Sequence, residues 1–408
     1  MNRFEDLRAA LPGDFVGRQE PLQIDGAAAS IVATPPTEEA LAATLRAVGE
    51  RGFGALICGG GTRLGLGNPP RRADLLLSTS GLSEIRELDA DEGVLLAAAG
   101  TPLTLLREAA HAAGWQLPLD PPGSASTLGG ALAAAAVGPR FGSPRQYTLG
   151  LSLVAADGTH TRFGARVVKN VTGYDLVKLH VGALGSLGVI TSAWLRLLPN
   201  PEAVESQRVS IPWSGFSEAW VRVLEGARFS CVRVAAVDAT RADADPLLSF
   251  ELAGDAEAVS WEARELEKLL STETDDSGRL AEIRALQDGS GATDEVSVAL
   301  HSVPSQIPAV LDQLRAENAA VLAYPRRGEL FAHFDGSEGQ RSERIVRCLK
   351  RAAELGRGHY TVTSAPLKFK EGLDVFGVPD AQLPVFRNLK RAFDPDGVLN
   401  PGRFAGRL

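Results

Sequence analysis

Three glycines and a threonine directly follow a short apolar stretch, and residues of these types can bind phosphate. Residues 55–58 are apolar, and Gly59, Gly60, Gly61 and Thr62 come next. Glycine has no Cβ, so its backbone N–H can approach an anion closely, and the threonine hydroxyl adds a further donor. The same pattern also fits a tight turn after a buried strand, so this motif alone leaves both interpretations open.

Two further segments rich in glycine and small residues follow this loop. One spans residues 121–130 and leads into an alanine-rich run, and the other spans residues 182–191 and leads into a long apolar stretch. Three such loops beside predicted strands can converge on one large ligand that carries phosphate. Their candidate residues are Pro122, Gly123, Ser124, Thr127, Gly129 and Gly130, and then Gly182, Gly185, Gly188, Val189 and Ile190.

Several common catalytic patterns are absent from the sequence. Neither G-x-G-x-x-G after a strand nor G-x-x-x-x-G-K-S/T occurs, which disfavours a Rossmann site and a P-loop. There is no G-x-S-x-G elbow of a serine hydrolase, and the six histidines include no metal-binding i, i+4 pair, so we expect no metal site. The three cysteines are scattered, so the chain cannot build an iron–sulfur cluster alone.

Length and composition narrow the class of protein further. A chain of 408 residues suits two or three domains, and 44% hydrophobic with 23% charged residues is ordinary for a globular protein. The net charge of −8 argues against a nucleic-acid partner, because a polyanion needs a basic face. We find neither a secretory signal nor an apolar run that could cross a membrane, which predicts a cytoplasmic or peripherally attached protein.

The elements that position the loops alternate between strands and helices. We expect strands at 31–36, 55–58, 75–78 and 93–99, with a helix that Thr37 caps and Gly52 ends. A second helix starts at Thr101 and Pro102, and strands at 149–155 and 189–198 follow. The proline pair around Asn200 then marks a domain boundary, so we assign residues 1–200 to the first domain.

In residues 201–378 the glycine-rich loops give way to amphipathic helices that alternate with short strands, and we assign this segment to a second domain. Helices are expected at 255–270, 304–317 and 337–355, and strands at 229–237, 247–252, 295–303, 319–324 and 329–334. This order predicts an α+β domain with helices on one face of a largely antiparallel sheet. The remaining segment, 379–408, carries apolar residues among its turn residues, and we expect it to dock back onto the first domain.

Taken together, these motifs resemble the vanillyl-alcohol-oxidase-type FAD-binding family. Within it they are most similar to flavin-bearing subunits of bacterial glycolate dehydrogenases. The matching motifs are 59–62, 122–130, 168–176, 185–191 and 399–402, with weaker likeness at 366–368 and 372–377. The resemblance implies an α+β protein, in which a two-subdomain FAD-binding domain of the PCMH type precedes an α+β cap domain.

The same resemblance implies a role for each glycine-rich loop. Residues 59–62 would hold the FAD pyrophosphate, the candidates in 121–130 would line the pyrophosphate and ribityl side, and those in 182–191 would reach the adenine end or the isoalloxazine edge. Asn400 would close the site from the tail. Relatives that bind flavin covalently carry a histidine in the first loop, where this chain has Thr62 and Arg63, so we expect non-covalent FAD. Arg63 itself could pair with phosphate or point to solvent.

The catalytic residues stay unassigned at this stage. Catalytic relatives carry a histidine-rich motif of the type H-x-G-D-G-x-x-H in the cap. Residues 331–336 match this motif only in part, with one histidine. Oxidation of a 2-hydroxy acid needs a base and cations for the carboxylate. Residues of suitable type in the cap, each more often an ordinary surface cation or core histidine, are Arg326, Arg327, His333, His359 and Lys368.

The resemblance implies one subunit of a multi-subunit dehydrogenase that oxidises glycolate, a small 2-hydroxy acid, to glyoxylate. Its partners would be a catalytic flavoprotein subunit and an iron–sulfur subunit, through which the chain could lie peripherally at the inner membrane. A basic helix face within 341–351 is either solvated or docks an acidic partner. The alternatives are a self-sufficient flavoenzyme for another hydroxy acid or alcohol, and a non-catalytic assembly subunit.

Overall fold

The N-terminal domain begins with a small mixed sheet. A computed structural model describes residues 3–11, 16–166, 174–241, 244–336 and 341–408. The sheet has the order β1-β2-β4-β3, and its strands are β1 (Val16–Ile24), β2 (Ala27–Ala33), β3 (Ala55–Cys58) and β4 (Leu75–Ser78). β4 pairs in parallel with both β2 and β3, because the chain crosses over between them through helix α2 (Glu38–Glu50).

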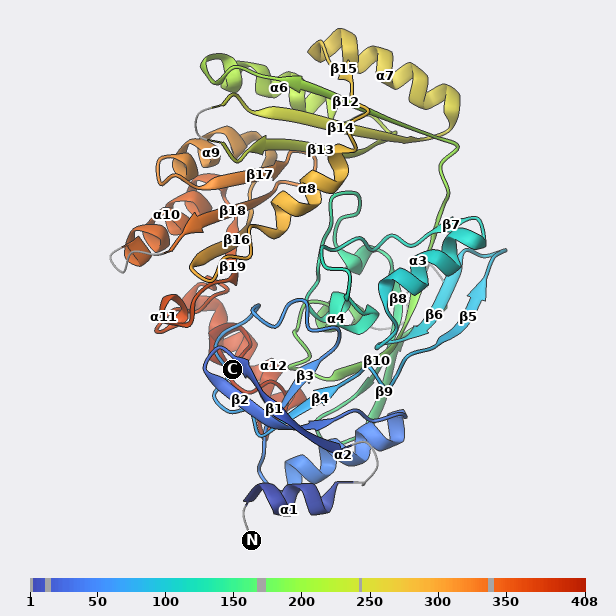
Figure 1. Cartoon of the computed structure of the whole chain (residues 1–408), viewed down its shortest axis with the longest axis vertical. Helices are drawn as coiled ribbons and strands as arrows, with labels where there is room; N and C mark the ends of the chain where they lie inside the picture. The colour runs from blue at the N-terminus through green and yellow to red at the C-terminus, as the bar shows by residue number, and fades with distance from the viewer. Residues whose placement is uncertain (1–2, 12–15, 167–173, 242–243, 337–340) are drawn as a thin grey trace.

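Local sequence signals explain the limits of α2. The hydroxyl of Thr37 accepts a hydrogen bond from the N–H of Ala40 at 3.1 Å, as a capping residue should. The apolar face of the helix packs on the small sheet, and the short helix α1 (Arg3–Ala10) lies beside it (Figure 1). The strand β3 then ends directly at the first glycine loop.

The second layer of this domain is a five-stranded antiparallel sheet in the order β5-β6-β10-β8-β9. A further short pair, β7 (Trp115–Gln116) with β11 (Leu198–Pro199), lies at its edge. Helices α3 (Leu103–Ala112), α4 (Leu128–Ala133) and α5 (Val177–His180) pack on its apolar face. The five strands are β5 (Ile85–Asp89), β6 (Val94–Ala98), β8 (Thr148–Val154), β9 (His160–Gly164) and β10 (Val189–Arg196).

The cap is built on one antiparallel sheet of eight strands in the order β15-β12-β14-β13-β17-β18-β16-β19. Four helices cover one face, α6 (Phe216–Gly226), α7 (Ala256–Leu270), α9 (Ile307–Arg315) and α10 (Arg341–Gly356). The strands are β12 (Ala203–Ser210), β13 (Val232–Ala239), β14 (Leu247–Gly254), β15 (Glu273–Thr274), β16 (Glu295–His301), β17 (Ala320–Tyr324), β18 (Glu329–Asp335) and β19 (His359–Ser364).

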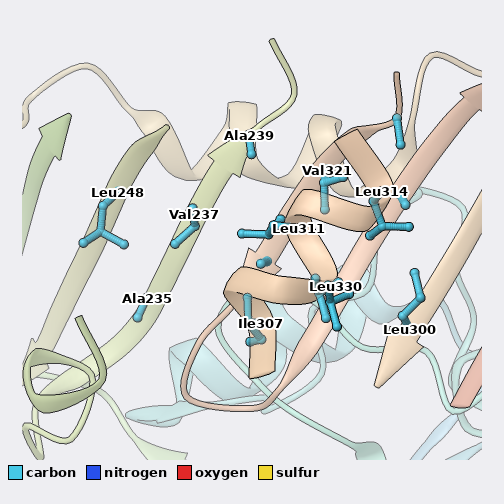
Figure 2. Packing of buried hydrophobic residues seen from close by; sticks show 14 of the residues in the cluster. Ala235, Val237, Ala239, Leu248, Leu300, Ile307, Leu311, Leu314, Val321 and Leu330 are labelled. Atoms are coloured by element: carbon cyan, nitrogen blue, oxygen red, sulfur yellow. The ribbon is translucent and has the colours of Figure 1, made fainter. Parts of the chain in front are cut away.

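The main core of the cap lies between this sheet and the helices. Ile307, Leu311 and Leu314 project from α9 toward alternate residues of the strands, such as Val237 and Leu330 (Figure 2). This spacing of three and four residues on the helix, against a period of two on the strands, is the sequence pattern that predicts such a layer.

One helix contradicts the prediction that all cap helices share one face. Helix α8 (Arg279–Asp288) packs on the opposite face, where Ile283 contacts Val234 and Tyr324 in a separate small cluster. It lies on the side of the sheet that faces the N-terminal domain (Figure 1). The physical reason is that this face is not a solvated surface: it packs against another part of the chain, so it too needs apolar cover.

The C-terminal segment returns to the N-terminal domain through α11 (Leu367–Lys370) and α12 (Leu383–Phe393). Leu399 forms a parallel bridge with Ala55. The N–H of Ala55 donates to the carbonyl of Val398 at 2.8 Å, and the N–H of Asn400 donates back to Ala55 at 2.8 Å. The tail therefore extends the small sheet beside β3, at the entrance to the first glycine loop.

The predicted fold class is confirmed, because the structure combines a two-layer N-terminal domain with an α+β cap. The predicted strands and helices are present with ends displaced by a few residues. The elements that were not predicted are strands β1, β5, β7, β9, β12, β15 and β19 and helices α1, α4, α5, α6, α8, α11 and α12. The predicted motif 168–176 lies outside the described residues up to 173. Within the described part, no helix has the length and apolar character needed to cross a bilayer.

Candidate functional site

An open cleft of about 720 Å³ lies where the first glycine loop, helix α4, the third glycine loop and the C-terminal tail meet. Most residues that the sequence analysis selected, from three glycine-rich loops and the C-terminal tail, line this one cleft. They are Gly59, Gly60, Gly61, Thr62, Thr127, Gly129, Gly130, Gly185, Val189, Ile190 and Asn400.

The first and second glycine loops touch, which explains two of the glycines. A Cβ on Gly60 would lie 1.7 Å from the carbonyl oxygen of Ala125, and one on Gly59 would lie 2.3 Å from Oγ1 of Thr127. The N–H of Gly60 donates to this same hydroxyl at 3.3 Å. Gly61 has φ +74°, a left-handed conformation that glycine adopts without strain. Contacts with the second loop and the backbone conformation of Gly61 therefore fix the position of the first loop.

The first loop carries backbone donors that no protein group uses. Among the described residues, the N–H groups of Gly59, Thr62 and Arg63 have no hydrogen-bond acceptor. All three belong to residues that line the cleft. Backbone N–H groups without an acceptor in the protein are usual donors to a bound phosphate.

Some predicted residues support the cleft without lining it. A Cβ on Gly123 would lie 3.0 Å from Cγ2 of Thr62, and Pro122 accepts a long hydrogen bond from Arg63, so both lie behind the first loop. Ser124 is exposed. A Cβ on Gly182 would meet Nη2 of Arg145 at 3.0 Å, while Gly188 lies next to His180.

Asn400 joins the tail to two other parts of the cleft. Its side-chain oxygen accepts from the N–H of Ile57 at 2.9 Å, and its amide nitrogen donates to the carbonyl of Leu184 in the third loop. The side chain is 3% exposed. Asn400 therefore fixes the relative positions of the strand before the first loop and the third loop.

Two arginines add positive charge to the cleft wall. Arg63 lines the cleft, its Nε has no partner among the described residues, and burial lowers the pKa of its guanidinium while Asp288 opposes this shift. Arg403 is 5% exposed and its Nη1 has no partner there either. Sequence reasoning missed Arg403, although it directly follows the motif 399–402.

Other residues of the cleft wall were also not predicted. They are small or apolar and carry no motif of their own, so only their position in the folded chain identifies them. They are Ile57, Cys58, Leu64, Leu66, Thr79, Ala133, Ala134 and Leu184. Burial raises the pKa of the Cys58 thiol, so this group is a neutral part of the wall.

The cap candidates do not form one cluster. Arg326 and Arg327 line a separate cavity beside Pro139 and Tyr147, which shares no residue with the glycine-loop cleft. His359 stacks on His301 with ring centroids 4.5 Å apart, and burial lowers the pKa of both rings. Lys368 is exposed.

His333 shares an electrostatic neighbour, Asp288, with Arg63 of the first loop. Its Nδ1 lies 2.9 Å from Oγ of Ser297 and 3.6 Å from Glu295, its Nε2 is buried, and the backbone of Leu286 also interacts with the ring. Asp288, the last residue of α8, interacts electrostatically with both His333 and Arg63. Burial lowers the pKa of His333 despite these carboxylates, so the ring is neutral near pH 7.

The cleft has the features that FAD requires. Free backbone donors and unpaired guanidinium nitrogens suit the diphosphate, and apolar residues such as Leu64, Leu66 and Val189 suit the ring systems. Within the described residues, no group of three or more histidine, cysteine or acidic side chains is placed to hold a metal ion.

Comparison with known proteins defines the class. Residues 29–164 match the FAD binding domain family, and residues 378–404 match the C-terminal domain of FAD linked oxidases. The fold is that of p-cresol methylhydroxylase, with a TM-score of 0.76 at 17% identity, covering 98% of this chain and 96% of that one. The chain is an FAD-dependent oxidoreductase, and FAD is its cofactor.

Two relatives differ in their sequence identity to this chain and in how much of it they match. D-lactate dehydrogenase of Archaeoglobus fulgidus is 29% identical over 417 residues, which cover 93% of this chain and 92% of the relative. Glycolate oxidase subunit GlcE of Escherichia coli is 44% identical over 128 residues, which cover 30% of this chain and 37% of that subunit. The sequence identity to the glycolate oxidase subunit is thus higher, but the match covers only 37% of that subunit.

Proposed function

We propose that this protein is an FAD-dependent dehydrogenase of small 2-hydroxy acids, and that glycolate, oxidised to glyoxylate, is its substrate. The observation that carries the proposal is the cleft, which is lined by residues with unused backbone donors and by two arginines. The names of the two relatives, a D-lactate dehydrogenase and a glycolate oxidase subunit, support a CH–OH donor that carries a carboxylate.

The cofactor is held without a covalent bond. The N–H groups of Gly59, Thr62 and Arg63 bind the diphosphate, helped by the second loop, while Gly185, Val189 and Ile190 contact the rest of FAD. The cleft wall contains no histidine among its described residues, which supports the expectation drawn from Thr62. Acid precipitation is therefore expected to release all FAD into the supernatant, and flavin retained in the pellet would contradict non-covalent binding.

His333 is the proposed proton acceptor. Oxidation of the hydroxyl carbon removes two electrons, which bound FAD accepts, and the hydroxyl proton needs a base. A neutral imidazole can take that proton on Nε2, and Glu295 and Ser297 on the other side of the ring stabilise the cation formed. His333 belongs to the cap and is not among the residues that line the glycine-loop cleft, so in this proposal substrate lies between the cap and that cleft.

The chain works, in this proposal, as one subunit of a complex with a catalytic flavoprotein and an iron–sulfur subunit. The match to the glycolate oxidase subunit supports this organisation. A self-sufficient dehydrogenase is the second candidate, because the D-lactate dehydrogenase matches along nearly the whole chain. The proposed domains, 1–200, 201–378 and 379–408, and a peripheral place at the inner membrane through partners belong to the same proposal.

One experiment separates these candidates. The purified chain, with FAD bound, is mixed anaerobically with glycolate, D-lactate or L-lactate, and the flavin absorbance band is followed before and after co-purifying partners are added. Bleaching by the chain alone supports the self-sufficient enzyme, and bleaching only with partners supports the complex. A variant His333→Gln should slow bleaching at least tenfold with unchanged FAD content. No bleaching by any of these acids in either state would overturn the proposal.

A further inference from the structure

Arg403 is an unusual buried cation. It is 5% exposed, and among the described residues no carboxylate lies within ion-pair distance of it. Its Nη2 donates to the carbonyls of Leu64, at 2.7 Å, and Leu66, but its Nη1 has no partner in that part of the chain. A buried charge without a counter-ion is costly, so such a group is expected to meet an anion from outside the protein.

The one nearby acid is already paired. Asp25 attracts Arg403 only at longer range, because both of its oxygens accept from Nζ of Lys370, at 3.0 and 2.9 Å. The same ammonium donates to the carbonyl of Gly65 at 2.6 Å and is 0% exposed. Lys370 and Asp25 therefore neutralise each other and leave the charge of Arg403 uncompensated.

The surroundings also fix the direction of the guanidinium. The backbone of Arg403 is bound on both sides, since its carbonyl accepts from the N–H of Asn68 at 3.0 Å and its N–H donates to Asn400 at 3.0 Å. Its side chain is aligned by the carbonyls of residues 64 and 66, which Lys370 holds from the far side at Gly65. The remaining nitrogen, Nη1, is itself buried, in a residue that lines the cleft wall.

We propose that Arg403 is a cofactor-binding residue whose guanidinium pairs with the diphosphate of FAD, and that Lys370 is the positioning residue that holds the 64–66 turn against it. The diphosphate is the permanently charged part of FAD, which makes it the anion that a permanently charged guanidinium best matches. This proposal goes beyond the proposed function, because it concerns how the cofactor is held and requires no substrate.

The test measures binding of FAD to the apo form of the whole chain. Arg403→Met should raise the Kd for FAD about 10- to 100-fold, as expected for loss of a charge-assisted hydrogen bond. Arg403→Lys should recover part of this loss, because the ammonium keeps the charge. Arg403→Gln provides a second uncharged variant, whose amide can still donate to the carbonyl of Leu64 if the methionine variant does not fold. ADP serves as a competitor that carries a diphosphate without a flavin ring.

Arg407 provides the matched control. It lies in the same tail and donates to the carbonyls of Lys370, at 2.7 Å, and Leu373, at 2.9 Å, but it does not line the cleft. Arg407→Met should lower the unfolding temperature of the apo protein while leaving the Kd for FAD within about twofold of wild type.

Three results would overturn the proposal. The first is a Kd for FAD that Arg403→Met leaves unchanged, and the second is an equal loss of affinity in Arg403→Met and Arg407→Met. The third is an affinity for ADP that does not fall with the affinity for FAD. Failure of glycolate to reduce the flavin would overturn the proposed function and leave this inference standing.

Discussion

At the scale of single residues, Gly60 shows how the first loop depends on the absence of a side chain. Because a Cβ there would lie 1.7 Å from a backbone oxygen of the second loop, Gly60→Ala must push the two loops apart. We expect a loss of about 1–3 kcal/mol in the free energy of unfolding and a large loss of bound FAD. Thermal unfolding and the flavin-to-protein absorbance ratio measure both effects.

Gly215 is the control for this substitution. A Cβ on Gly215 has no neighbour within 4 Å, and its φ of −114° suits any residue, so Gly215→Ala should change neither quantity. A Gly60→Ala protein that holds FAD and unfolds like wild type would show that the loops separate without cost.

At the scale of elements, His180 packs the short helix α5 against its neighbours. Its burial predicts that the free energy of unfolding depends on pH. The ring stacks on Phe163 of β9 at 5.3 Å and meets the edge of Phe393 of α12 at 5.4 Å. Neither of its nitrogens has a partner among the described residues, and burial lowers its pKa from 6.5 to about 4. The ring is neutral in the folded protein at pH 7.

The direction of the effect follows from that lowered pKa. Between pH 6.5 and 4 the unfolded chain binds a proton that the folded chain does not, so the stability that His180 contributes is full above pH 6.5 and falls as the solution becomes more acidic. At pH 5 the loss is about 2 kcal/mol. Urea unfolding of wild type and His180→Leu at pH 7.5 and 5 tests this. The variant should lose less stability on acidification, and equal losses would contradict the assignment.

At the scale of the whole molecule, one loop of the N-terminal domain fastens it to the cap. Arg140 donates to both oxygens of Glu251 on β14, at 2.6 and 2.8 Å. The carbonyls of Val137 and Pro139 accept from Gln287 and Arg327 of the cap, each at 2.9 Å. These contacts hold the cap against the N-terminal domain.

Removing the charged contact should loosen this attachment. Because Arg140 is 36% exposed and can regain water, Glu251→Ala is expected to cost only about 1–2 kcal/mol of unfolding free energy. A double-mutant cycle with Arg140→Ala, followed by denaturant unfolding, isolates the pair. The exposed pair of Arg166 and Glu87, both 42% exposed, is the control and should show a coupling below about 0.5 kcal/mol. Equal coupling free energies in the two pairs would mean that the interdomain ion pair stabilises the fold no more than an exposed surface pair does.

The sequence by itself determined the glycine loops that line the cleft and many of the regular elements. A site built from backbone groups, as we propose for FAD, leaves a local signature, because glycine is required where loops touch, as at Gly60, or where φ is positive, as at Gly61. Helices such as α2, with Thr37 at its start, likewise follow from capping and periodicity within a few residues.

Only the tertiary structure decided which distant side chains complete the cleft. Arg403 is identified by its burial and its free nitrogen, and both depend on the tail pairing with β3. The placement of α8 on the inner face of the cap, and the separation of Arg327 from the glycine-loop cleft, depend on how the two domains pack. Contacts of this kind join residues far apart in the chain, and no local pattern of residue types encodes them.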